Sequence, residues 1–166
     1  MNILYSLTSY PPAIGGAQLH THQVVKRLAA SNNVQVITQW TQHRTDWLLG
    51  TTLNAPHELQ AYEVDGVRVQ PITLTHRERW RLAPYVMSYY LLKALAIDRI
   101  SDVLAEKINE HAQNIELLHN ARIGREALSY ASLKVARRRD VPFVFVPYHH
   151  PRWVGWVYKE YIALYR

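Results

Sequence analysis

Residues 2–17, NILYSLTSYPPAIGGA, decide the fold class of this chain. Asn2–Ser6 has the composition of a β-strand, and the two prolines and two glycines that follow predict a specialised loop over 7–16. Apolar residues then return at helical spacing over 17–30, and 34–37 supplies a second strand. The opening is therefore β-loop-α-β, the unit that places two parallel strands side by side.

The rest of the chain continues the alternation of strands and helices. The sequence predicts a hairpin over 62–69, around an Asp-Gly pair, and then a long helix over 84–112 that is opened by a proline and contains a break. Two strands, 115–119 and 142–146, are expected to alternate with two helices, 127–139 and 154–166. We expect one α/β domain spanning residues 1–166, Rossmann-like and three-layered, with a mainly parallel sheet covered on both faces.

Composition narrows the classes of function. The 166 residues carry 19 Lys plus Arg against 13 Asp plus Glu, a formal charge of +6, and no cysteine. Disulfide scaffolds, thiol chemistry and Cys-x-x-Cys zinc sites are thereby excluded. The longest apolar run, Leu82–Ile97, is interrupted by Ser88 and Lys93, and the N-terminus lacks a signal-peptide pattern, so we expect a cytoplasmic protein. The positive charge favours an anionic partner.

Three loops at strand ends are candidate sites, because ligands of open parallel sheets bind beyond the carboxyl ends of the strands. They are residues 15–16, 119–122 and 149–153. Gly15 and Gly16 precede a helix, whose first N–H groups can bind a phosphate if the backbone is approachable. Glycine would permit both unusual φ values and close approach. The alternative is a loop that merely needs to turn.

His149 and His150 follow the apolar strand 142–146, where an imidazole can hydrogen-bond or deprotonate a substrate hydroxyl near neutral pH. The alternative is that one of them only caps the strand. A metal site of His20, His22, His149 and His150 lacks an accompanying His-Glu-x-x-His motif or carboxylate cluster, so we expect no metal. Neither the dinucleotide-binding nor the P-loop glycine motif is present.

Residues 76–81, HRERWR, are compatible with an anionic membrane surface through Arg77, Arg79, Trp80 and Arg81. We favour the alternative, a solvated loop whose tryptophan packs onto the domain, because Glu78 dilutes the positive charge and the apolar residues that follow are needed for the core. The basic residues are otherwise dispersed, and no nucleic-acid-binding motif is present, so nucleic acid is not an expected partner.

Two motifs together resemble the N-terminal domain of family-four glycosyltransferases, retaining enzymes of the GT-B fold. One is Pro11-Pro12-x-x-Gly15-Gly16-Ala17-Gln18-x-His20, and the other is VPFVFVPYHHP at 141–151. The resemblance covers the whole chain in element order, including Leu118-His119-Asn120.

The resemblance implies an enzyme in which this chain is the acceptor-side half of a GT-B architecture and a C-terminal domain holds the nucleotide-sugar. It implies that the backbone at Gly15 and Gly16 approaches the donor diphosphate. It also implies that His150, with His149 as the alternative, touches the transferred sugar. The acceptor would be a glycan, lipid or small molecule, and the co-substrate a nucleotide-sugar without a metal. Further candidates for the acceptor site or cleft are His20, Asn120, Arg122 and Arg152.

The chain departs from the family at two points. The family often has Glu where this chain has Gln18, and the donor-binding domain is missing from these 166 residues. We therefore expect the isolated chain to be inactive. The alternative function is a non-catalytic Rossmann-like module that binds a sugar or phosphate, or that docks a separate donor-binding domain. Either function could be combined with peripheral attachment of the protein at the inner face of an anionic membrane.

Overall fold

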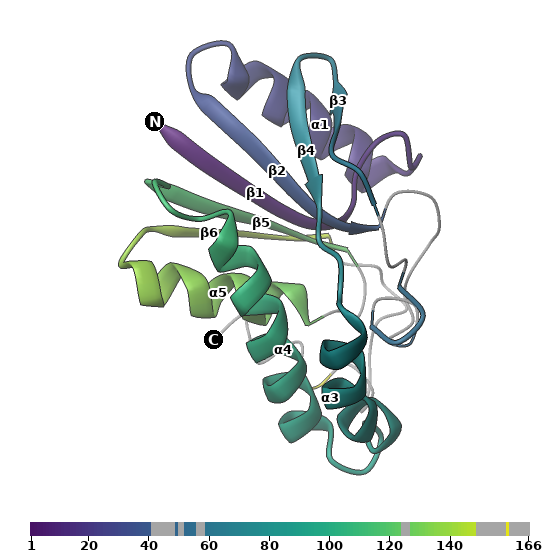
Figure 1. Ribbon diagram of the computed structural model, residues 1–166. Helices are drawn as coiled ribbons and strands as arrows, with labels where there is room; N and C mark the ends of the chain where they lie inside the picture. The colour runs from purple at the N-terminus through teal and green to yellow at the C-terminus, as the bar shows by residue number, and fades with distance from the viewer. Residues whose placement is uncertain (41–48, 50–51, 56–58, 124–126, 149–158, 160–166) are drawn as a thin grey trace.

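A six-stranded sheet forms the middle layer of the computed structural model, which describes residues 1–40, 49, 52–55, 59–123, 127–148 and 159 (Figure 1). The strand order is β3-β4-β2-β1-β5-β6, and every neighbouring pair is parallel except β3 and β4. The strands are β1 Asn2–Ser9, β2 Asn33–Trp40, β3 Tyr62–Val64, β4 Val67–Pro71, β5 Leu117–Ile123 and β6 Phe143–Tyr148. The expected Rossmann-like α/β domain with a mainly parallel sheet is confirmed.

Helices cover both faces of the sheet. The described helices are α1 Gly16–Ala29, α3 His76–Met87, α4 Lys93–Glu110 and α5 Leu128–Arg139. In Figure 1, α1 lies on one face, while α4 and α5 lie on the other with α3 packed beside α4. The result is three layers, as the alternation of apolar strands and amphipathic helices predicts.

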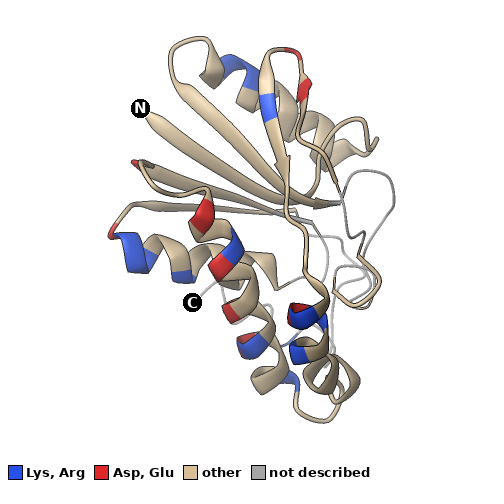
Figure 2. Cartoon of the chain, in the orientation of Figure 1, with Lys and Arg blue, Asp and Glu red and all other residues tan. Residues whose placement is uncertain are grey.

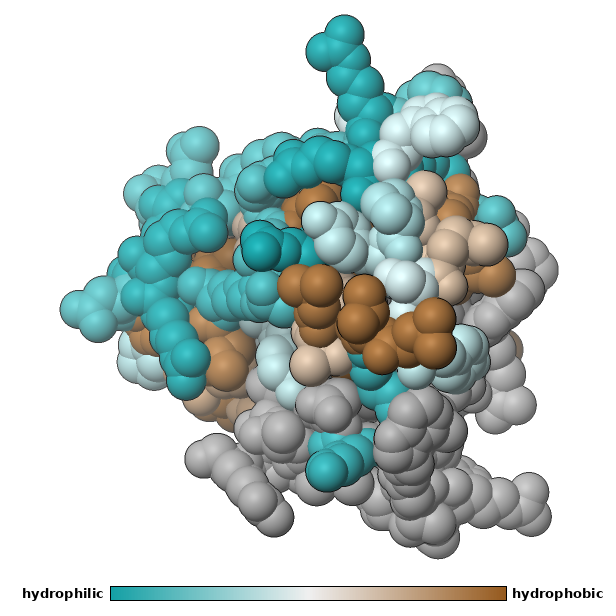
Figure 3. All heavy atoms as spheres, turned by 90° about the horizontal axis from the view of Figure 1, so that it is seen from below, coloured by the Kyte–Doolittle hydropathy of each residue, from teal (hydrophilic) through white to brown (hydrophobic). Residues whose placement is uncertain are grey.

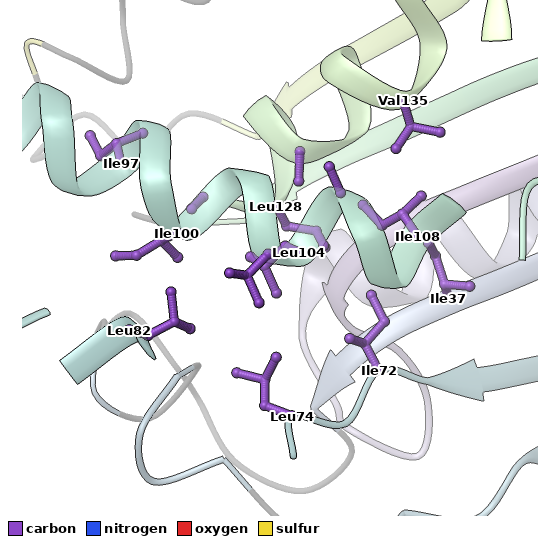
Figure 4. Close-up of a cluster of buried hydrophobic side chains, with 14 of the residues drawn as sticks. Ile37, Ile72, Leu74, Leu82, Ile97, Ile100, Leu104, Ile108, Leu128 and Val135 are labelled. Atoms are coloured by element: carbon purple, nitrogen blue, oxygen red, sulfur yellow. The ribbon is translucent and has the colours of Figure 1, made fainter. Parts of the chain in front are cut away.

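Alternation along β1 divides the core between the two faces. Leu4 points to the α4 and α5 side, while Tyr5 and Leu7 belong to the cluster that packs under α1 with Val25. Figure 4 shows the larger cluster, in which Leu104 and Ile108 of α4 lie among side chains of the sheet and of α5. All of these side chains are almost fully buried.

Strands β1, β2, β5 and β6 continue beyond the ends that the sequence predicts, and the extensions of β1 and β5 bear on the candidate site. β1 continues through Leu7 to Ser9, pairing with β2, so the expected loop begins only at Tyr10. β5 continues through Asn120 and Arg122, paired with β6, where a loop was expected. Pairing with neighbouring strands sets these ends, whereas the polar residues Thr8, Ser9 and Asn120 suggested earlier stops.

The break predicted in the helix from Pro84 is observed, because two helices occupy this region, but the predicted start at Pro84 is wrong. α3 begins at His76, where Thr75 and Glu78 form a capping box: the Thr75 hydroxyl accepts from the Glu78 N–H at 3.3 Å, and Glu78 accepts from the Thr75 N–H at 2.7 Å. Pro84 therefore lies inside α3. A turn over 88–92 then leads into α4.

The predicted hairpin is confirmed between β3 and β4, which pair antiparallel. Its turn places Asp65 at φ 50° and Gly66 at φ 78°. Two successive positive φ values are typical of the tight turn that Asp-Gly favours. The hairpin forms one edge of the sheet, beside α1.

Candidate functional site

The strand order reverses direction between β1 and β5. From β1 the chain passes through α1 to β2 on one side, and it later crosses to β5 on the other side of β1. At such a switch point the loops after the two strands diverge and leave a crevice at the carboxyl edge, which is where open α/β sheets bind ligands. The loop after β1 contains Gly15 and ends at Gly16, the first residue of α1.

The N-terminus of α1 is open. Gly15 is the N-cap residue and has no side chain to accept a hydrogen bond from the first-turn N–H groups, and that turn carries no acidic residue. Among the described residues, no atom lies within 4 Å of a Cβ built on Gly16. The free N–H groups, the positive end of the helix dipole and the open space together suit an anionic oxygen-rich group.

The backbone conformation does not require glycine at position 15, which is a correction to the expected unusual φ. Gly15 is extended, with φ −171°, a conformation open to any residue. A Cβ there would meet the Gln18 side-chain oxygen, the far end of a flexible side chain that would have to move aside. Gln18 donates to the Ser9 hydroxyl at 2.7 Å and so links α1 to the end of β1. Gln18 thus stabilises the position of this loop through the hydrogen bond to Ser9.

Tyr148, which the sequence analysis did not single out, joins the end of β6 to α1. Its hydroxyl lies 2.6 Å from His20 Nδ1 and 3.1 Å from the Thr21 hydroxyl. The His20 and Tyr148 rings meet edge to face. His20 therefore lies beside the end of β6, at the carboxyl edge of the sheet. The sequence signals for Tyr148 were its place shortly after the predicted strand 142–146 and its membership of the motif at 141–151.

A second histidine of α1 has a different environment. His22 is buried, and its Nδ1 lies 2.7 Å from the hydroxyl of buried Tyr10, while its Nε2 lies 3.2 Å from Asp65. Lys26 donates to the same carboxylate at 2.8 Å, and these two partners, Lys26 first, lower the pKa of Asp65. The cluster ties together the loop after β1, α1 and the hairpin turn. His20 and His22 thus face different partners.

Asn120 is not a cleft residue, which corrects its expected role. It is fully buried in β5, and its Nδ2 donates to the backbone oxygen of Ser6 at 3.1 Å and to the Ser6 hydroxyl at 2.9 Å. The Ser6 hydroxyl also lies 2.7 Å from that of Ser132 on α5. Asn120 therefore holds β5, β1 and α5 together through buried hydrogen bonds.

His119 is also part of the sheet rather than of a loop. Its ring stacks on Tyr5, with centroids 4.2 Å apart and planes at 25°. Burial lowers the pKa of His119 from 6.5 to about 4, and Nδ1 has no hydrogen-bond partner. The imidazole is therefore neutral at physiological pH, and its ring packs against Tyr5 on the α1 side of the sheet.

Several predicted site residues lie outside the described residues. These are His149, His150 and Arg152, together with the side chain of Arg122, whose backbone pairs with Pro147 at the end of β5. Within the described ranges, no group of three or more histidine, aspartate or glutamate side chains is arranged to hold a metal ion. In the same part of the chain, no helix has the length and apolar character needed to cross a bilayer.

The segment 76–81 is helical, which corrects the expected solvated loop. Trp80 is 69% exposed rather than packed onto the domain, and its indole N–H donates to His76 at 2.8 Å. Arg79 is buried instead, donating to the backbone oxygens of Leu74 and Leu53 at 3.1 and 2.9 Å. Its remaining nitrogen, Nη2, is buried without a partner, and desolvation lowers its pKa.

A polar pocket of about 470 Å³ lies at the opposite, amino-terminal edge of the sheet. Its wall includes the first residues of β1 and β2, the exposed Arg68 of β4, and Glu110 and His111 at the end of α4. No predicted site residue lines it, so it is separate from the opening at Gly16.

Comparisons with known proteins add little to this geometry. No protein-family model matches the chain, and no curated protein matches its sequence. Among solved structures, the C-terminal domain of a hydrogenase from Pyrococcus furiosus is similar at 14% identity and a TM-score of 0.41, over 87% of this chain and 90% of that one. A likeness at this level says nothing about activity.

Proposed function

We propose that this chain is the acceptor-side domain of a nucleotide-sugar-dependent glycosyltransferase, the half of a GT-B enzyme that meets the donor diphosphate and shapes the acceptor site. The proposal joins the resemblance of residues 11–20 and 141–151 to the family with the geometry at the carboxyl edge of the sheet. A donor-binding domain is the required partner, and the 166-residue chain alone is expected to be inactive.

The open N-terminus of α1 at the switch point is the observation that carries the proposal. When a nucleotide-sugar reacts, the bond from the anomeric carbon to the diphosphate oxygen breaks, and the diphosphate leaves with increased negative charge. Fixed N–H donors and a helix dipole aimed at that charge stabilise the transition state more than the ground state. The N–H groups at Gly16 and Ala17 are suited to this role because no side chain of Gly15 occupies them.

The surroundings of Gly16 supply hydroxyl and imidazole groups of the kind that recognise sugars. His20 and the Tyr148 hydroxyl lie at the same edge as the start of α1 and interact at 2.6 Å. His149 and His150 follow Tyr148 directly in the sequence. We assign contact with the transferred sugar to His150, with His149 as the alternative, and a place beside the acceptor to His20, Arg122 and Arg152.

Transfer of labelled sugar from a panel of nucleotide-sugars by the complete polypeptide that the gene encodes tests this function. Gly16→Ala should lower kcat/KM by about 100-fold, because a methyl group displaces the diphosphate from the N–H donors. The fold should tolerate this change, since no atom of the described residues lies within 4 Å of the new Cβ. Replacing glycine by alanine in a helix should even raise stability by about 0.4–1 kcal/mol.

His150→Ala and His149→Ala, made separately, complete the test. One of them should abolish transfer, while Arg27→Gln, an exposed change in the last turn of α1, should leave it intact. Full activity in both histidine variants would contradict their assigned role. Sugar or phosphate binding with no turnover by the wild type would favour the non-catalytic module instead.

A further inference from the structure

The corner between α3 and α4 exposes large apolar side chains at one end of the molecule. Leu91 is 88% exposed and Met87 77%, and the same corner includes Tyr90, Leu92 and Leu95. Figure 3, seen from below, shows apolar side chains gathered on this end of the protein. We call Met87, Tyr90, Leu91, Leu92 and Leu95 the apolar tip. An exposed cluster of this kind marks an interaction surface rather than a scattered surface leucine.

An exposed basic stripe leads to the apolar tip along α3. Arg77, Trp80, Pro84 and Met87 are all exposed and follow helical spacing, so they lie on one side of the helix, with exposed Arg81 next to them. At 1.5 Å per residue, Arg81 lies about 9 Å along the helix from Met87. The distance between the positive charge of Arg81 and the apolar side chain of Met87 is thus about equal to the depth to which interfacial helices enter a lipid surface.

The acidic residues near this stripe oppose its charge only in part, because Glu78 is turned inward and the ion pair of Glu106 with Arg81 is exposed to solvent. Glu78 is largely buried in the capping box and pairs with Lys107 at 3.0 Å, so it does not dilute the arginines. Between Leu82 and Ile97 the sequence contains no Asp or Glu and one cation, Lys93. Figure 2 shows that charged residues on α3 belong to its first turns and that its far end has none. Arg81 approaches Glu106 only to 3.9 Å, with both side chains exposed.

We propose that the α3–α4 corner docks on an anionic phospholipid bilayer, with the apolar tip entering the acyl boundary and Arg77 and Arg81 contacting lipid phosphates. Trp80 and Tyr90, each with an apolar ring and one polar group, are suited to the headgroup level between them. The near-complete exposure of Leu91 leaves its side chain free to enter the lipid, and the neighbouring arginines supply the charge complementary to an anionic headgroup. Arg79 takes no part, because it is buried.

This surface is independent of the proposed transferase site, since none of its residues lies in the loops that follow β1, β5 or β6. It also gives the basic segment 76–81 the role at an anionic membrane that its composition allowed, in place of the solvated loop that the sequence analysis favoured. Two of its three arginines, rather than all three, face outward together with Trp80.

Cosedimentation with vesicles tests the docking surface. The wild-type chain should bind vesicles of phosphatidylcholine containing phosphatidylglycerol and lose affinity as salt rises. Leu91→Ser should weaken binding at every salt concentration. Ile14→Ser is its matched control, because Ile14 is 89% exposed but precedes α1 on the opposite face of the sheet, and it should bind like the wild type.

The charge contribution has its own matched pair. Arg77→Gln with Arg81→Gln should lower the partition coefficient about 25-fold at low salt, from about fivefold for each cation near the surface. Arg137→Gln with Arg138→Gln removes the same charge from the exposed end of α5 and should change binding much less.

Three results would overturn the proposal. They are absence of wild-type binding to anionic vesicles, equal losses in the two arginine pairs, and equal losses in Leu91→Ser and Ile14→Ser. A wild-type dimer in sedimentation velocity that Leu91→Ser converts to a monomer would also overturn it, because a second copy would then cover the apolar tip. Thermal unfolding of each variant separates loss of binding from loss of fold.

Discussion

His119 shows how a single residue acquires a chemical character that its sequence neighbours do not indicate. The sequence places it at the end of the predicted strand 115–119 and at the start of the candidate loop 119–122. The register of β5 instead places it against Tyr5, where burial lowers its pKa to about 4. A histidine in this position contributes an aromatic surface and not a proton.

The lowered pKa of His119 predicts a pH dependence of stability. The unfolded chain binds a proton at this site near pH 6.5 and the folded protein only near pH 4, so the free energy of unfolding should fall as pH drops between these values. His119→Phe retains an aromatic ring against Tyr5 but cannot titrate. Urea unfolding from pH 7.5 to 4.5 should therefore show a shallower loss of stability in the variant than in the wild type.

The pKa of His111 is also lowered by burial, but His111 is present in both proteins, and its effect cancels in the comparison. Parallel loss of stability in His119→Phe and the wild type across this pH range would show that His119 titrates normally in the folded protein. The stacked and desolvated environment described for His119 would then be contradicted.

Gly16 illustrates what the sequence does predict at the residue scale. Two glycines before a helix indicate an open anion site, and the structure shows the N-terminus of α1 uncapped with free space at Gly16. The unusual φ expected at Gly15 is wrong, because this residue is extended.

At the scale of the elements, buried polar side chains fasten the centre of the sheet to α5. Asn120, Ser6 and Ser132 come from β5, β1 and α5 and form hydrogen bonds of 2.7–3.1 Å in a fully buried place. Local composition suggested that β5 ends before Asn120, since its partners are distant in the sequence. Strand pairing and this network explain why the strand continues.

Asn120→Ala should lower the free energy of unfolding by about 1–3 kcal/mol, because it removes buried hydrogen bonds and leaves the Ser6 groups without this donor. Urea unfolding measures the loss, and exposed Asn114→Ala should cause almost none. In the complete enzyme, the KM for the acceptor should stay the same. If the stability were unchanged and the KM for the acceptor were raised, Asn120 would be a cleft residue, as the sequence analysis expected.

The helices also show that local sequence patterns predict some element boundaries and miss others. The 3.6-residue period correctly identifies α1, α5 and most of α4, because each buries one stripe against the sheet. The capping box at Thr75 and Glu78 was present in the sequence as a signal for the start of α3, yet Pro84 suggested a later start. The exposure of Trp80 depends on how α3 packs beside α4, which no local pattern contains.

At the scale of the whole molecule, the order of the strands locates the site. Consecutive β-α-β units predict a parallel sheet, but only the observed order β3-β4-β2-β1-β5-β6 places the switch point beside the loop that leads to Gly16. The α3–α4 corner projects from this body away from the sheet (Figure 1). The proposed anion site and the apolar tip are therefore separate features of the same domain.

The central claim is that the start of α1 receives a diphosphate. Two-dimensional amide NMR of the chain, titrated with inorganic pyrophosphate, measures this directly. The account predicts that the N–H signals of Gly16 and Ala17 shift together with weak affinity, at dissociation constants of about 1 mM, and that Gly16→Ala reduces the shifts. Shifts confined to the amino-terminal edge around Arg68 and His111, or no shifts at Gly16 and Ala17, would contradict it.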